Sequence, residues 1–460
     1  MEGPGLGLTR AAVQLAEDQI ARACNTFRLG HLAQEVLGSR GLRFPVLPFI
    51  SKELRLRRSA FKTTDGRMRI AYVANYHGPS LVKQRPVSSN RSLANTIKLE
   101  LISKMLRQLS HEVEVISHGE VADRKRGFYP ECHEEQPFHP DIPIDYASVL
   151  RLRRVEPVWS SLSMLRILRR RHRAAPFDVV IVWNLKLPHL ICAHYVVQRL
   201  KVPVILQYED DAFVDIWGKP SRNSFGHHAF ARSILQQVSA CMGCSPWLLS
   251  QTPPHIPKLL LRGVVGADIV NHAAQNDAKR KNWVLFSGTH CQQYGLGALI
   301  TAWEKAGLSD WELHITGYGE DTPMLRKQAE SVPGTRFHGL VSREELVRLM
   351  CSAAICMNPH DVSHVPGNLF AFKIVEYLSA GAHVITTRMG PAEKELEQGI
   401  TYMPDNKPET IAATLRQVIE TRQWEQRAAE FARNTYGPAT VAKSLDDLIR
   451  QVVQRRNGSH

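Results

Sequence analysis

Short runs of β-branched residues alternate with amphipathic helices along most of this chain of 460 residues, and the series occurs twice. Strands of the first series are expected at 68–74, 111–117, 178–183, 202–208 and 239–245, with helices at 93–109, 188–200 and 225–237. Strands of the second series are expected at 283–287, 311–316, 336–340, 354–358 and 384–387, with helices at 296–306, 323–331, 343–352 and 369–380. This alternation predicts parallel sheets with helices on both faces. The sequence therefore predicts an α/β fold with two doubly wound domains facing a central cleft.

Breaks in this pattern suggest where the domains begin and end. Residues 1–66 are helical in pattern and basic, and we treat them as an N-terminal extension. Pro253, Pro254 and Pro257 interrupt the chain after the first series. We expect a first domain at 67–262, a second domain at 263–437, and a C-terminal helix at 438–460 that crosses back to the first domain.

The composition is that of a globular protein, with 43% hydrophobic and 22% charged residues. No run approaches the ~20 consecutive apolar residues of a membrane-spanning helix. The N-terminus has no basic-then-apolar signal pattern, because Glu17 and Asp18 interrupt it. We therefore expect a cytoplasmic protein.

The net charge of +14 is concentrated in two clusters. One lies at Arg55, Arg57, Arg58 and Lys62, and the other comprises Arg151, Arg153, Arg154, Arg166, Arg169, Arg170, Arg171 and Arg173. Such clusters suit anionic partners, including the inner face of an anionic membrane, or they are solvated helix faces. No nucleic-acid-binding motif accompanies them, so we expect no nucleic-acid partner.

Cofactor and metal motifs are missing from the expected strand ends. Gly78, Gly288 and the pair Gly317 and Gly319 each follow a strand, but none belongs to a complete dinucleotide fingerprint. No Asp-x-Asp motif stands on a suitable loop, since Asp210 and Asp211 are adjacent. We expect neither a cofactor nor a metal.

One loop-to-helix segment in the second half has the residues of a nucleotide site. Asn368 is a favoured N-cap residue, and the helix expected after Gly367 would offer free backbone N–H groups to a diphosphate. Lys373 and Glu376 share a face of this helix. The lysine suits diphosphate charge and the carboxylate suits ribose hydroxyls. The alternative is a solvated ion pair at helical spacing.

The amino-acid sequence of this segment resembles that of the donor half of group-one glycosyltransferases, the large retaining GT-B family with two Rossmann-like domains. Many members read Phe-Pro-x-Lys-x-x-Glu-Tyr-Leu-Ala-x-Gly, and this chain reads Phe-Ala-Phe-Lys-Ile-Val-Glu-Tyr-Leu-Ser-Ala-Gly over 370–381. The resemblance extends over residues 68–435. It implies a nucleotide-sugar donor, with ribose at Glu376 and further donor contacts at Gly367, Asn368, Leu369, Gly288, Gly317 and Gly339.

The chain departs from the family pattern at three donor positions. Asn368 stands where many members have an acidic residue that contacts the donor sugar. Thr289 and Tyr294 stand where many have the arginine and lysine that hold the diphosphate. Stabilisation of the leaving group would then fall to the helix N-terminus, to Lys373, and to His290 or Arg262; a structural role is the alternative for His290.

The first domain offers acidic residues at an expected strand end. Glu209 and Asp210 follow the strand at 202–208, where they could bind acceptor hydroxyls or act as a base, or simply cap a helix and carry solvated charge. His77, Gly78 and Asn184 follow two other strands and are further acceptor-side candidates; glycine at 78 would permit close approach of a ligand.

The sequence therefore predicts a glycosyltransferase that moves a sugar from a nucleotide-sugar donor to a glycan, lipid-linked or small-molecule acceptor. Lys373, Asn368, Glu209 and Asp210 are the candidate catalytic residues. Metal independence follows from the missing metal motif, and retention of configuration is implied by the resemblance. Two alternatives remain: an inactive scaffold that binds sugar nucleotides or polysaccharide, and a nucleotide-sugar epimerase.

Overall fold

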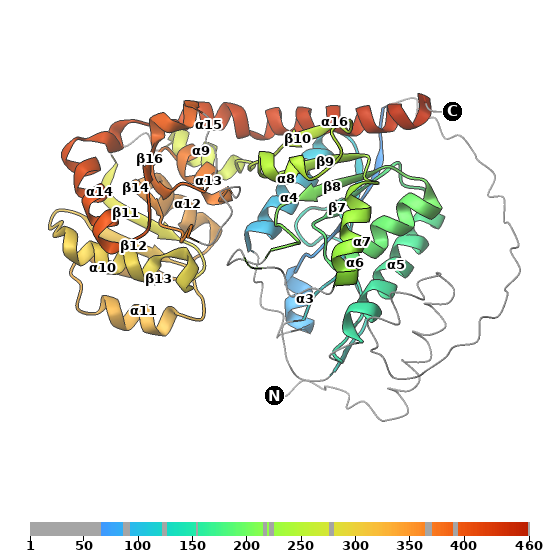
Figure 1. Ribbon diagram of the computed structural model, residues 1–460, viewed down its shortest axis with the longest axis horizontal. Helices are drawn as coiled ribbons and strands as arrows, with labels where there is room; N and C mark the ends of the chain where they lie inside the picture. Colours follow the sequence, from blue (N-terminus) through green and yellow to red (C-terminus); the bar gives the residue numbers. More distant parts are fainter. Residues whose placement is uncertain are drawn as a thin grey trace, which may run out of the picture.

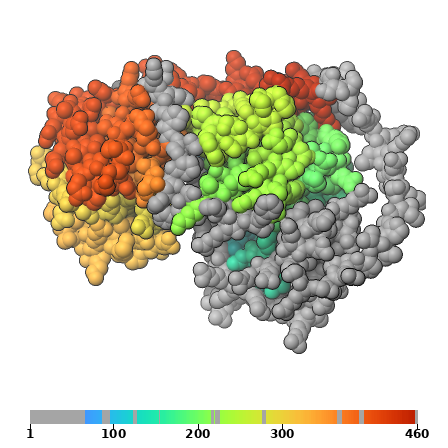
Figure 2. Space-filling view, in the orientation of Figure 1, coloured from blue at the N-terminus to red at the C-terminus, as the bar shows by residue number. Residues whose placement is uncertain are grey.

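The computed structural model describes residues 66–458, except 86–92, 122–126, 153–154, 215–218, 220–224, 276–279, 364–369 and 390–393. Two α/β lobes lie side by side, and one long C-terminal helix runs along both of them (Figure 1). The space-filling view shows this helix lining one edge of the two lobes (Figure 2). No helix of the described residues is long and apolar enough to cross a membrane.

The first lobe is built on an eight-stranded sheet. Its order is β10-β9-β8-β7-β1-β2-β5-β4, and only β4 runs antiparallel to its neighbour. The strands are β1 (Arg69–Ala74), β2 (Glu112–Ser117), β4 (Cys132–Glu134), β5 (Ile144–Tyr146), β7 (Val179–Trp183), β8 (Val204–Tyr208), β9 (Ala240–Gly243) and β10 (Lys258–Leu260). Its helices are α3 (Pro79–Gln84), α4 (Leu93–Gln108), α5 (Glu156–Ala174), α6 (Leu187–Tyr195), α7 (Phe225–Leu235) and α8 (Pro246–Ser250).

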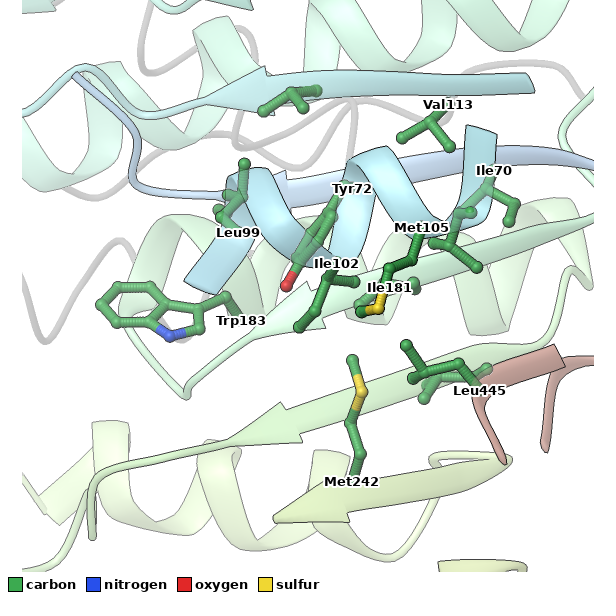
Figure 3. Packing of buried hydrophobic residues seen from close by; sticks show 14 of the residues in the cluster. Ile70, Tyr72, Leu99, Ile102, Met105, Val113, Ile181, Trp183, Met242 and Leu445 are labelled. Carbon is green, nitrogen blue, oxygen red and sulfur yellow. The ribbon is translucent and has the colours of Figure 1, made fainter. Parts of the chain in front are cut away.

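Both faces of this sheet are buried. Neighbouring residues of a strand point to opposite faces, and each face is covered by its own apolar cluster. Ile70 and Tyr72 of β1 pack in one apolar cluster, and Ala71 and Val73 pack in the cluster on the other face. Helix α4 supplies side chains to the first cluster, as Figure 3 shows. The continuous apolar strands of the sequence are explained by this two-sided burial.

The second lobe has a fully parallel six-stranded sheet of order β13-β12-β11-β14-β15-β16. The strands are β11 (Lys281–Ser287), β12 (Glu312–Thr316), β13 (Thr335–Gly339), β14 (Ala353–Asn358), β15 (His383–Thr387) and β16 (Ile400–Met403). Its helices are α9 (Ala267–Gln275), α10 (Leu296–Ala306), α11 (Thr322–Ala329), α12 (Arg343–Ser352), α13 (Phe372–Ser379), α14 (Pro408–Glu420) and α15 (Ala429–Tyr436). The predicted α/β fold with two doubly wound sheets is confirmed.

Some elements differ from the sequence prediction. Strands β4 and β5 extend the first sheet, and β3 (Phe128–Tyr129) pairs with β6 (Val149–Leu150) in a separate ribbon. These strands have two or three residues each, too few for a period to be read. Helix α13 begins at Phe372, so its predicted start at 368–369 is wrong; Ala371 is the N-cap, in an extended conformation. The extension at 1–65 lies outside the described residues.

The arginine-rich stretch coincides largely with α5, and several of its side chains are ion-paired. Arg171 bonds the buried carboxylate of Asp145 at 2.5 Å, and Arg170 bonds Glu131 at 2.6 Å. Arg166 and Arg173 are exposed on the same helix. Arg153 and Arg154, and the cluster at 55–62, lie outside the described residues.

The final helix, α16 (Pro438–Gly458), packs on the first lobe although it follows the second. Val441, Leu445, Ile449 and Val452 recur at helical spacing and are buried in the cluster that contains β1 and α4. Figure 3 shows Leu445 directed toward the same core. The helix therefore ties the end of the chain to the first sheet.

Because Leu445 is 1% exposed in this core, we expect Leu445→Ala to destabilise the first lobe by about 3 kcal/mol through the cavity it leaves. Denaturant unfolding followed by circular dichroism would measure the loss. Lys443→Ala, at an exposed position of the same helix, serves as the control and should change stability by less than ~0.5 kcal/mol. Equal effects of the two substitutions would contradict the packing role of α16.

Candidate functional site

The carboxyl ends of strands from both sheets face one another between the lobes. Asp210, directly after β8, acts electrostatically on Tyr294, which follows β11. The backbone of Phe370 bonds the thiol of Cys244, which follows β9. The guanidinium of Arg262 lies 4.8 Å from the centre of the Phe370 ring. Ligands of open α/β sheets bind at such strand ends, so this region is the candidate site.

Lys373 lies on the second-lobe side of this region, in the first turn of α13. Its ammonium donates a hydrogen bond to the Ser287 carbonyl at the end of β11, at 3.2 Å. It also lies 4.8 Å from the ring centre of Phe286 and 5.4 Å from that of Tyr294. Burial lowers the pKa of Lys373 to about 8. The ammonium has no carboxylate partner among the described residues, which leaves it suited to an anionic ligand.

Glu376 lies one turn further along α13 and is 7% exposed. Its Oε1 accepts a hydrogen bond from Arg343 Nη1 at 2.7 Å, and Arg343 Nε in turn donates to Asp268 at 2.7 Å. Burial raises the pKa of Glu376, and the charge of Arg343 opposes that rise. The alternative of a solvated pair between Glu376 and Lys373 is therefore wrong.

Three predicted glycines form tightly packed turns at the strand ends of the second sheet. A Cβ on Gly317, which has a φ of +122°, would lie 1.9 Å from the Gly288 carbonyl oxygen. The N–H of Gly317 donates to the Gly339 carbonyl at 2.9 Å. A Cβ on Gly288 would lie 3.3 Å from Lys373 Nζ. Gly288 thus keeps the space beside the ammonium open, and Gly317 is required by backbone packing.

His290 does not reach the region between the lobes. Its side chain is fully buried, and Nδ1 bonds the Thr322 hydroxyl at 2.9 Å. The ring packs edge-on against Phe337, with the centroids 6.0 Å apart. Desolvation lowers the pKa of His290, so the neutral ring is favoured. These contacts favour the structural role, and the donor-side role of His290 stays a prediction.

Three predicted donor residues, Gly367, Asn368 and Leu369, lie outside the described residues. The N-cap position predicted for Asn368 belongs instead to Ala371, which makes no side-chain cap hydrogen bond. Phe372, the first residue of the helix, packs closely on Gly263, where a Cβ would lie 2.9 Å from its ring.

In the first lobe, Asn184 holds the acidic pair in place. Asn184 has a φ of +52°, and its side-chain oxygen accepts hydrogen bonds from the backbone N–H of Glu209 and Asp210. Its side-chain amide donates to the Asp210 carboxylate at 2.7 Å. Asp210 is exposed, and desolvation by the surrounding protein followed by the charge of Glu209 raises its pKa. Asn184 is therefore a positioning residue for Asp210.

Glu209 is engaged by a lysine that the sequence analysis did not identify. Lys98 Nζ lies 2.6 Å from Glu209 Oε1, and Gln207 donates to the same oxygen at 2.8 Å. Lys98 also donates to the Leu261 carbonyl at 3.0 Å, next to the crossover between the lobes. The sequence did not indicate this contact, because Lys98 lies on α4, 111 residues from Glu209, and belongs to no motif. Asp210 is thus the more available acid of the pair.

His77 and Gly78 lie at the end of β1 with different surroundings. His77 Nε2 lies 2.8 Å from the Glu120 carbonyl oxygen, and Lys186 forms an ion pair with the Glu120 carboxylate at 2.9 Å. Burial raises the pKa of Glu120, but Lys186, His118 and His77 together lower it to about 2. Gly78 is buried, and a Cβ there would lie 2.4 Å from the Tyr146 hydroxyl. Tyr146 occupies the space of a side chain at position 78, and the acceptor-side role of Gly78 stays a prediction.

Comparison with known sequences identifies both halves of the chain. Residues 281–421 match the family "Glycosyl transferases group 1", and residues 98–252 match the family "Glycosyl transferase 4-like domain". Among curated proteins, no sequence matches significantly.

Solved structures of low sequence identity share the fold. Sucrose-phosphate synthase from Thermosynechococcus elongatus superposes with a TM-score of 0.63 at 13% identity, over 85% of this chain and 100% of that chain. The Anabaena protein HepE in complex with UDP gives 0.59 at 14%, over 84% and 100%. A glycosyltransferase of avilamycin A biosynthesis gives 0.51 at 13%, over 84% and 98%. Sequence families and fold agree across both lobes, and this chain belongs to the glycosyltransferases of GT-B fold.

Proposed function

We propose that this enzyme transfers a sugar from a nucleotide-sugar donor on the second lobe to an acceptor on the first. One observation carries this proposal: a desolvated ammonium, that of Lys373, and a buried carboxylate, that of Glu376, lie on the same helix at the strand ends without bonding each other. A diphosphate would neutralise the first, and ribose hydroxyls would donate to the second. HepE is known in complex with UDP and with UDP-glucose, so uridine nucleotides are the first donors to test.

The leaving nucleoside diphosphate carries the charge that the site must stabilise. Lys373 and the N–H groups of the first turn of α13 supply positive potential from one side, which supports transfer without a metal ion. Thr289 and Tyr294 add hydroxyl groups at positions where the family often has basic residues. We propose retention of anomeric configuration on the family resemblance.

On the first lobe, Asp210 is the acid that we assign to acceptor hydroxyls. Glu209 is bound by Lys98, whereas Asp210 is exposed and acts electrostatically on Tyr294 of the other lobe. A glycan, a lipid-linked sugar or a small hydroxylated molecule would each suit this arrangement. We further propose a cytoplasmic enzyme that works beside an anionic membrane face, to which the exposed residues Arg166 and Arg173 of α5 are suited.

The proposal is tested by incubating the full chain with UDP-, ADP- and GDP-sugars and measuring the nucleoside diphosphate released. Slow hydrolysis of one donor is expected even without an acceptor, and Asp210→Asn should lower transfer once an acceptor is found. Isomerised donor without release of nucleotide would favour the epimerase. Binding without turnover across all donors would favour the scaffold.

Lys373 gives the proposed diphosphate site a defined pH dependence. Its pKa of about 8 means that the ammonium is present below that pH and lost above it. We expect the affinity for UDP to fall as pH rises from 7.5 to 9.5, by up to about tenfold per unit. Titration calorimetry would measure this fall.

Lys373→Met is the matched variant for this measurement. It should bind UDP at least about tenfold more weakly at pH 7.5 and show a flat profile above that pH. A wild-type profile that is already flat, or a variant that keeps the wild-type slope, would assign the diphosphate to another group.

A further inference from the structure

The side chain of Arg343 lies between two carboxylates that come from different helices. Its Nη1 donates to Glu376 of α13 at 2.7 Å, and its Nε donates to Asp268 of α9 at 2.7 Å. The third guanidinium nitrogen, Nη2, lies 3.5 Å from the other oxygen of Asp268. The guanidinium is therefore held from two sides, with its plane fixed by Asp268.

The two ends of this chain of contacts differ in exposure. Glu376 is 7% exposed, whereas the side chain of Asp268 is 43% exposed. Asp268 is thus the solvated anchor and Glu376 is the enclosed end. Only Oε1 of Glu376 is engaged, because no donor among the described residues reaches Oε2. A carboxylate with one oxygen held by arginine keeps the other for hydroxyl donors.

The backbone before α9 is shaped to permit this contact. A Cβ on Gly266 would lie 2.1 Å from Asp268 Oδ1 and 3.3 Å from Arg343 Nη2. Only a residue without a side chain allows the Asp268 carboxylate to fold back over the turn toward Arg343. Gly266 follows the crossover between the lobes, so this turn belongs to the segment that joins them.

Helix stability alone does not explain an arginine at this position. Arg343 is the first residue of α12, where the positive end of the helix dipole disfavours a cation. Ser342 already caps the helix, and Glu344 and Glu345 supply the favourable acidic charge. The arginine therefore opposes the local preference of the helix and satisfies the carboxylates of its neighbours instead.

We propose that Arg343, oriented by Asp268, is a positioning residue that keeps Glu376 ionised and aims its free oxygen at the ribose hydroxyls of the donor. The inference rests on the proposed function, since it assumes that Glu376 binds the nucleotide. Without a cation, an enclosed carboxylate takes up a proton and loses the capacity to accept two hydroxyl hydrogen bonds.

The charged groups around Glu376 define the expected pH response. Arg343 of α12 and Asp268 of α9 act on it electrostatically, and Glu376 in turn raises the pKa of Tyr377 within α13. Arg433 of α15 bonds a backbone carbonyl of α13 instead. Arg343 is thus the cation that opposes the effect of burial on the pKa of Glu376. Its removal should move the loss of nucleotide affinity to higher pH.

The test is a double-substitution cycle on the full chain, with UDP affinity measured by calorimetry and ADP and GDP run in parallel. We expect Arg343→Gln to weaken nucleotide binding about tenfold relative to wild type at pH 7, and part of this difference from wild type to disappear when both are measured at pH 8.5. In a Glu376→Gln background the same change should cost less than about twofold. The nucleotide affinity of Arg343→Lys should lie between that of the wild type and that of Arg343→Gln.

Arg348→Gln is the matched control, because Arg348 pairs with Glu345 on the exposed face of the same helix. It should leave affinity unchanged. If Arg343→Gln does not fold, the cycle is read with Arg343→Lys and Asp268→Asn. Equal losses in both backgrounds, or a loss independent of pH, would overturn the positioning role. If Glu376→Gln alone leaves nucleotide affinity unchanged, the proposed donor site fails instead.

Discussion

Burial of charge at the strand ends of the second lobe is the constraint on which the candidate site depends. A desolvated ammonium or carboxylate costs several kcal/mol unless another group compensates it. Glu376 has such a group in Arg343. Among the described residues, Lys373 has only a carbonyl and two aromatic rings as partners. The fold therefore gives the carboxylate of Glu376 a counterion and leaves the ammonium of Lys373 without one. An anionic ligand can neutralise that ammonium.

The first lobe divides its two adjacent acids in the same way. Lys98 neutralises Glu209, whereas Asp210 keeps an exposed carboxylate that is oriented by the amide of Asn184. Desolvation and the charge of Glu209 raise the pKa of Asp210. Two neighbours in sequence thus have different chemistry, and only their surroundings distinguish them.

The sequence predicted the parts of the fold that depend on local period. The strands and most helices appear within a few residues of their expected ranges, since two-sided burial makes their apolar runs continuous. The segment around Lys373 and Glu376 was identified from residue spacing together with its resemblance to the family's sequence motif. Spacing alone suggested that the two residues pair with each other, because it contains no information on what lies opposite a helix face.

The remaining errors and omissions concern long-range contacts. Arg343 and Lys98 stand 33 and 111 residues from the carboxylates that they bind, and neither belongs to a motif. His290 and Gly78 were placed near ligands because they follow strands, yet protein groups fill the space around them. Position at a strand end predicts the edge of the sheet, whereas the direction of a side chain is decided by packing.

The crossover between the lobes shares its contacts with the site. Lys98, which neutralises Glu209, also binds the Leu261 carbonyl at its start. Arg262 lies over the ring of Phe370, just before the helix that carries Lys373. The segment that joins the lobes therefore contacts residues of both halves of the candidate site, Lys98 on the first lobe and Phe370 on the second.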